Sequence, residues 1–245
     1  MKRISYLFAF ALMMVAVTAT PSKATLINIH QLDNTTETRA VKNFDAISSS
    51  GSFNILVKID GTETLKLEGN AEDLEKIETV VENGTLKIKT KKVSGDNWNW
   101  KFTGKINVYI SAKQLNSLAM NGSGNIKVDG KMDANSVALR VNGSGMINTA
   151  IKAETANVSV NGSGNINVSG DVDDLKVSIA GSGSMRGNNL KSSESNVKIA
   201  GSGNASFGVE KTLNATIAGS GSVRYSGDPT LNVSKAGSGS VSKMK

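Results

Sequence analysis

Apolar and polar residues alternate in short stretches through the second half of the chain, and most of these stretches flank a Gly-Ser-Gly triplet. Apolar residues two positions apart precede the first five triplets: Leu118 and Met120, Leu139 and Val141, Val158 and Val160, Val177 and Ile179, and Val197 and Ile199. Others follow triplets, as at Ile126 and Val128 or Ile166 and Val168. Period-two alternation of β-branched residues is typical of strands with one buried face. The pattern predicts two short strands per repeat, joined by a sharp bend at the glycines.

The triplets recur at intervals of 18 to 21 residues, beginning at Gly122, Gly143, Gly162, Gly181, Gly201, Gly219 and Gly237. A unit of about 20 residues with two short strands cannot bury its apolar face alone, whereas stacked units bury a continuous core. Helical patterns are nearly absent from residue 118 onward. We therefore expect an all-β fold, a right-handed parallel β-helix (β-solenoid), in which residues 117–245 form the repeats and successive strands lie about 4.8 Å apart.

Stacking the triplets would place equivalent residues in columns. We expect the serines to hydrogen-bond through their hydroxyls along one column. The residue before the triplet is Asn at the first three corners and Ala at the other four, so amide-to-amide bonds are expected only in the first half. Both glycines should supply positive φ angles or allow adjacent turns to approach closely, where a Cβ would clash. These structural glycines are Gly122, Gly124, Gly143, Gly145, Gly162, Gly164, Gly181, Gly183, Gly201, Gly203, Gly219, Gly221, Gly237 and Gly239.

Residues 25–116 are less regular but also rich in strand patterns. Amphipathic stretches predict strands at residues 53–59, 65–67, 86–89 and 106–110. Asn83-Gly84 predicts a tight turn between two of them, and Asn70 is the expected N-cap of a short helix over residues 71–79. Ser50-Gly51-Ser52 looks like a degenerate corner. This part is therefore expected to form the first, less regular turns of one continuous domain and to cap it.

The N-terminus predicts a secretory signal peptide over residues 1–24. Lys2 and Arg3 precede an uncharged apolar run that ends at a small-residue cleavage site after Ala24 or, alternatively, Ala19. The run is too short for a membrane span, so none is expected after cleavage. The chain has no cysteine, although an exported protein could form disulfides. Its formal net charge of +7 is scattered rather than clustered, which argues against nucleic acid as a partner.

The corner pattern, together with Phe44-Asp45-Ala46-Ile47 and Ser50-Gly51-Ser52-Phe53-Asn54-Ile55, resembles the head GIN domain family. The resemblance extends from about residue 41 to residue 241. It implies a right-handed parallel β-helix and an adhesin-like role at the envelope of a bacterium, with a Gram-negative source expected. The protein would then be periplasmic, on the outer surface or secreted. Many relatives carry Asp after Gly-Ser-Gly, but here that position holds Asn125, Met146, Asn165, Ser184, Asn204, Ser222 and Ser240. Without a carboxylate column we expect no metal and no cofactor.

Few residues suggest catalysis. His30 is the only histidine, and the seven-fold repetition of the corner serines favours a structural role over that of a nucleophile. Asp171, Asp173 and Asp174 cluster between strands, as expected of solvated loop residues. The sequence therefore predicts no enzyme. A polysaccharide-active enzyme, for which acids and bases would have to meet on adjacent turns, is the second interpretation.

The strongest binding pattern is the stretch from Asn97 to Phe102, because Trp98, Trp100 and Phe102 would share one face of a strand beside Lys101. An exposed aromatic platform of this kind stacks on sugars or partner proteins. The alternative is that these rings cover an open part of the core. We therefore expect a monomeric, exported binding module whose partner is a carbohydrate or a cell-surface protein. A third interpretation is an envelope scaffold or stress protein without a soluble ligand.

Overall fold

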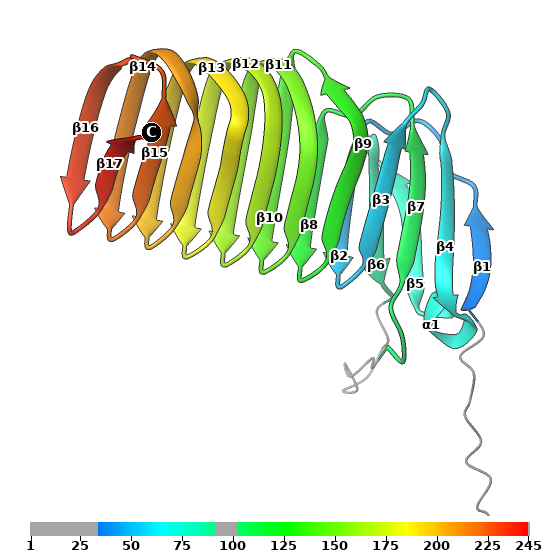
Figure 1. Cartoon of the computed structure of the whole chain (residues 1–245). Coiled ribbons are helices and arrows are strands. Elements are labelled where there is room, and N and C mark those ends of the chain that lie inside the picture. The colour runs from blue at the N-terminus through cyan, green and yellow to red at the C-terminus, as the bar shows by residue number, and fades with distance from the viewer. Residues whose placement is uncertain (1–33, 92–101, 245) are drawn as a thin grey trace, which may run out of the picture. The chain divides into compact units, whose positions relative to one another are not determined.

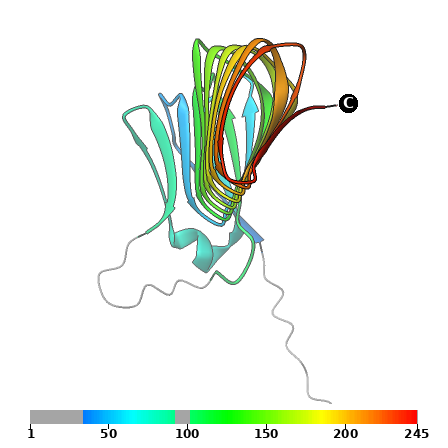
Figure 2. The ribbon, with the colours of Figure 1, turned by 90° about the vertical axis from the view of Figure 1, so that its left-hand side faces the viewer.

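The computed structural model describes residues 34–91 and 102–244. Among these residues, seventeen strands form one continuous sheet that winds into a β-solenoid, as Figure 1 shows. Figure 2, turned by 90°, looks along the stack and shows the turns as flattened loops that lie one behind another. The prediction of a parallel β-solenoid is confirmed.

Each repeat contributes to two faces of the solenoid. The strands that lead into a corner form the pre-corner face: β8 (Ser117–Gly122), β10 (Ser136–Gly143), the later parts of β11 (Met146–Gly162), β12 (Asn165–Gly181), β13 (Ser184–Gly201) and β14 (Asn204–Gly219), and then β16 (Thr230–Ala236). The strands that leave a corner form the post-corner face: β9 (Asn125–Asp133), the first parts of β11 to β14, β15 (Ser222–Ser226) and β17 (Ser240–Lys243). All these pairings are parallel, and inward-facing apolar residues of both faces form one core.

The corner glycines let successive turns approach closely. The first glycine of each triplet has a φ between 113° and 137°, a region that side chains disfavour. A Cβ on Gly162 would also lie 2.6 Å from the carbonyl oxygen of Gly143, one turn away. The second glycine is equally confined, because a Cβ on Gly164 would lie 2.4 Å from Cγ1 of Val141. The backbone fills this space, so a side chain cannot.

Polar columns run along the corners, but the serine column differs from expectation. Its side chains are exposed, and the described hydrogen bonds include none between these hydroxyls. Instead, the serine N–H groups bond along the stack, as Ser144 does to the Gly122 carbonyl at 3.0 Å. The amide column does form: Asn142 Nδ2 donates to Asn121 Oδ1 at 2.8 Å, and Asn161 Nδ2 donates to Asn142 Oδ1 at 2.9 Å.

The N-terminal strands are stacked out of sequence order. β2 (Ala46–Gly51) lies between β6 (Thr85–Thr90) and β8, and β3 (Asn54–Ile59) lies between β7 (Asn107–Ala112) and β9, all in parallel. The Gly51 corner is in register with Gly122, so the first turn in sequence is inserted beneath the first regular repeat. Beyond it the pairing becomes antiparallel: β7 pairs with β4 (Thr64–Asn70), β4 with β1 (Asn34–Arg39), and β6 with β5 (Ile77–Glu82).

A single turn of helix, α1 (Ala71–Glu75), connects β4 to β5 at this end. Asn70 caps it as predicted, accepting a hydrogen bond from the Glu72 N–H at 2.9 Å. The helix is shorter than the expected 71–79, because Ile77 is fully buried and starts β5. The predicted turn at Asn83-Gly84 is confirmed, with φ angles of 50° and 73° in the hairpin between β5 and β6.

Candidate binding groove

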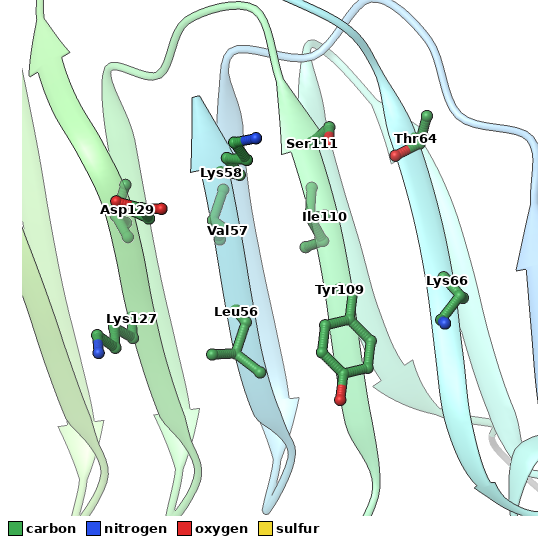
Figure 3. A pocket seen from close by; sticks show the side chains of 11 residues that line it. Leu56, Val57, Lys58, Thr64, Lys66, Tyr109, Ile110, Ser111, Lys127 and Asp129 are labelled. Atoms are coloured by element: carbon green, nitrogen blue, oxygen red, sulfur yellow. The ribbon is translucent and has the colours of Figure 1, made fainter. Parts of the chain in front are cut away.

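An open groove lies on the outer surface of the post-corner face, where the antiparallel strand β4 joins the parallel stack. It has a volume of about 640 Å³ and is lined by side chains from β4, β7, β3 and β9. Figure 3 shows these side chains across the four neighbouring strands: Leu56, Val57, Lys58, Thr64, Lys66, Tyr109, Ile110, Ser111, Lys127 and Asp129. The groove is therefore built from strands that are distant in sequence.

Strand register places four of these side chains in one line. Lys66 on β4 is opposite Tyr109 on β7, Tyr109 is opposite Leu56 on β3, and Leu56 is opposite Lys127 on β9. All four occupy outward positions of their strands, since their neighbours in sequence are buried. The result is a half-buried aromatic and aliphatic floor, Tyr109 and Leu56, with an exposed ammonium group at each end.

Tyr109 is held from two sides. The Lys66 ammonium lies 5.3 Å from the centre of its ring, a cation–π contact. A hydrogen bond to Glu68, together with burial, raises the pKa of the Tyr109 phenol above its ordinary value. Because the phenol keeps its proton at neutral pH, it brings no negative charge into the groove.

The charge of the groove is positive. Lys58, Lys66 and Lys127 line it against one carboxylate, Asp129. Lys58 lies 3.9 Å from Asp60, but within the described part of the chain neither Lys66 nor Lys127 forms a salt bridge. Ammonium groups that form no salt bridge among the described residues, beside an apolar floor, suit a ligand that carries both a negative group and a C–H-rich surface, such as an acidic sugar.

The predicted aromatic platform lies mostly outside the described residues, which exclude Trp98, Trp100 and Lys101. Phe102 is described: it is half-buried and packs edge-on against Phe53, with ring centres 6.0 Å apart. Since Phe53 is a fully buried residue of the Gly51 corner, Phe102 contacts the core. A platform formed by the tryptophans stays a prediction.

The other chemical candidates stay apart from the groove. Asp171, Asp173 and Asp174 are exposed on β12, within the repeats. No group of three or more His, Cys, Asp or Glu side chains that could hold a metal ion occurs among residues 34–91 and 102–244. Within these ranges, no helix is long and apolar enough to cross a membrane.

The sequence pattern did not reveal the groove, although it carried a signal. Outward positions of the repeats hold mostly Asn, Ser and other small polar residues, whereas those of β3, β4 and β7 hold Leu56, Lys58, Lys66 and Tyr109. Large outward side chains on three predicted strands were visible in the sequence. The sequence did not show which strands are neighbours, and the order of the strands decides whether these side chains lie together.

Comparison with known families supports the fold and a general role. A family model described as "Putative auto-transporter adhesin, head GIN domain" matches residues 43–229. No protein with a curated function matches the chain.

Several solved structures have the same fold. A putative adhesin from Bacteroides fragilis superposes with a TM-score of 0.77 at 21% identity, covering 86% of this chain and 97% of that one. A putative adhesin from Parabacteroides distasonis gives a TM-score of 0.74 at 20% identity, covering 87% and 98%. A putative lipid binding protein from the same species gives 0.71 at 28% identity, covering 86% and 97%.

Proposed function

The chain belongs to the family of adhesin-like head GIN domains, and on that premise we propose that it is an exported, non-catalytic binding module of the bacterial cell envelope or surface. We place its binding site in the groove between β4 and β9 and its ligand among the acidic carbohydrates. The observation that carries the proposal is the line Lys66, Tyr109, Leu56 and Lys127, in which an apolar floor has an exposed ammonium group at each end.

The chemistry of the groove favours binding over catalysis. Its one carboxylate, Asp129, has no second acid beside it among the lining residues, and glycoside hydrolysis ordinarily uses a pair of carboxyl groups. Tyr109 presents one ring face to Lys66 and keeps its proton. These groups can orient a sugar and neutralise its charge, which is what a binding module requires.

A lipid headgroup is a second candidate ligand, favoured by the fold-sharing Parabacteroides distasonis protein that is described as lipid-binding. A phosphorylated glycolipid would present the same acidic sugar chemistry. The two sources differ in whether the ligand is free or held in a bilayer, so one experiment can separate them.

The test is binding of the purified protein to an array of acidic and neutral oligosaccharides, with vesicles of phosphatidylglycerol as a second arm. We expect saturable binding to acidic sugars that Tyr109→Ala and Lys66→Gln each weaken about tenfold, because each removes one side of the floor or its charge. The matched control is Lys176→Gln, which removes an exposed charge from the pre-corner face.

Equal weakening by the control would show that binding does not depend on the groove in particular and would contradict the proposal. Binding only to vesicles would move the ligand to the lipid class. If a Trp98→Ala, Trp100→Ala variant lost binding while the groove variants bound normally, the site would lie on the predicted aromatic platform instead.

A further inference from the structure

The line of side chains in the groove continues from β9 to the last strand of the stack. Register extends it from Lys127 to Asn148 on β11, and then strand by strand to β17. We call it the axial row; in spatial order it consists of Lys66, Tyr109, Leu56, Lys127, Asn148, Asn167, Arg186, Ser206, Arg224 and Ser242. Four of its ten positions are cations and none is an acid.

The cations of the row are regularly spaced. Lys66, Lys127 and Arg186 follow one another at intervals of three strands, about 14 Å, and Arg224 lies two strands further. The row from Lys66 to Arg224 therefore extends about 38 Å. All four side chains are exposed, and no salt bridge of the described residues includes any of them.

Two further hollows lie on the same outer face, in line with the groove. One, of about 310 Å³, is lined by Asn148, Asn167 and Arg186 among others, and the next, of about 430 Å³, by Arg186, Ser206 and Arg224. Arg186 borders both. The surface is therefore hollowed at three places along the row, and each hollow has a cation at its border.

Hydrogen bonds hold the polar part of the row in place. Asn167 Nδ2 donates to Asn148 Oδ1 at 2.6 Å, and Asn148 Nδ2 donates to Asn125 Oδ1 at 3.2 Å. Arg186 donates to Asn165 Oδ1 at 3.2 Å. A surface fixed in this way loses little conformational entropy when it binds a ligand, so even individually weak contacts can add up.

We propose that the axial row binds one extended, linear acidic polysaccharide that lies along the axis of the stack, with the groove as the end of this track. The inference rests on the proposed function for the ligand class at the groove, and it adds that the ligand is a polymer with charges at many positions. A line of regularly spaced cations on a stacked sheet complements such a chain better than it complements a single charged sugar.

Other polyanions fit less well. Single-stranded nucleic acid is bound by several aromatic platforms, and the axial row contains one aromatic ring. A membrane surface would favour exposed apolar side chains, but the large ones among the described residues, Leu231 and Val233, lie on β16 of the pre-corner face. Both serve as comparison ligands below.

The experiment measures affinity for polygalacturonate and heparin, each as long chains and as disaccharides, at several salt concentrations. The distal variant is Arg186→Gln with Arg224→Gln. Its matched control is Arg140→Gln with Lys198→Gln, which removes two exposed cations from the pre-corner face. We expect the distal variant to bind long chains about fivefold more weakly and with a shallower salt dependence, with disaccharide binding unchanged. The control pair should change neither the affinity for long chains nor its salt dependence.

The row is overturned if long chains bind no more tightly than disaccharides, or if the control pair weakens them equally. The assignment to polysaccharide would be overturned if single-stranded DNA or phosphatidylglycerol vesicles bound as tightly as the long polysaccharides and the distal variant lost that binding. If Tyr109→Ala abolishes disaccharide binding and the distal variant binds long chains normally, the groove is supported as a binding site and the axial row is contradicted. Long-chain binding that depends on the distal pair, without disaccharide binding, supports the row and removes the groove.

Discussion

The regular repeats and the N-terminal part are both built from short strands, but the two regions serve different purposes. In the repeats, each turn pairs in parallel with turns 18 to 21 residues away, and the outward positions are mostly small polar residues joined in columns. In the N-terminal part, parallel and antiparallel pairings meet, and larger outward side chains form the groove. Repetition therefore yields a uniform, rigid support, whereas the interruption of the repeat creates a distinctive site.

The largest expected effect concerns a corner of the regular stack. Gly162→Ala should destabilise the protein by about 3–5 kcal/mol, because the new Cβ meets the Gly143 carbonyl oxygen and the φ of 116° is strained. Denaturant unfolding followed by circular dichroism measures it. Gly61→Ala is the N-terminal control: its φ is 84° with no atom within 4 Å, so only strain, about 1–2 kcal/mol, is expected. Equal effects would show that close packing of turns contributes nothing.

The next effect tests how the N-terminal cap is held. Asp73 on α1 is fully buried, pairs with Lys76 at 2.8 Å and accepts hydrogen bonds from the N–H and hydroxyl of Thr103. Asp73→Asn should cost about 2–4 kcal/mol, since it removes a buried carboxylate that pairs with the half-buried Lys76 and accepts two hydrogen bonds from Thr103. Glu72→Gln, an exposed change on the same helix, is the control and should leave the unfolding midpoint unchanged.

The same carboxylate predicts a pH dependence. Burial on its own raises the pKa of Asp73, but hydrogen bonds from Lys76, Thr103 and Gly104 outweigh it and hold the pKa below its ordinary 3.8. The group therefore stabilises the fold above its unfolded-state pKa, and this contribution is lost as the pH falls below about 4 and through the folded-state pKa. Stability measured from pH 7 downward should fall less steeply in Asp73→Asn. Parallel curves for the two proteins would refute the assignment.

The smallest effect concerns the exposed amide column. Asn142→Ala removes hydrogen bonds to both Asn121 and Asn161 and should cost about 0.5–1 kcal/mol, because exposed amides can bond to water instead. A double-mutant cycle with Asn161→Ala isolates the coupling between the two amides. A coupling energy of zero would mean that the hydrogen bonds of the amide column do not stabilise the corner.

The repeats could be predicted from the sequence because every position that determines the fold recurs. Alternation fixed which side chains face inward, and seven triplets fixed where the chain bends. The amide column followed from the same alignment. The prediction of hydrogen bonds between the serine hydroxyls was wrong, because the backbone N–H groups bond along the stack and the hydroxyls face solvent.

The order of the N-terminal strands in the sheet could not be predicted from the sequence pattern. Periodicity indicates that residues 54–59 and 107–112 form strands, but it does not name their partners. The insertion of β2 and β3 beneath the first repeat depends on how Gly51 and Phe53 fit under Gly122 and Gly124, a three-dimensional complementarity. The groove and the axial row depend on that order, so neither could be predicted before it was known.

The insertion of β2 and β3 also dictates how the chain can reach its native state. The first turn to be synthesised pairs on both sides with strands made later, and the Gly51 corner meets its Gly122 partner across about 70 residues. Closing so long a loop is slow, whereas each later repeat joins a completed neighbour only 18 to 21 residues away. Folding should therefore wait for β8 and β9 and then proceed repeat by repeat towards the C-terminus. If the chain is exported through a channel, as proposed, no stable core could form beyond the channel until about residue 129 had passed through.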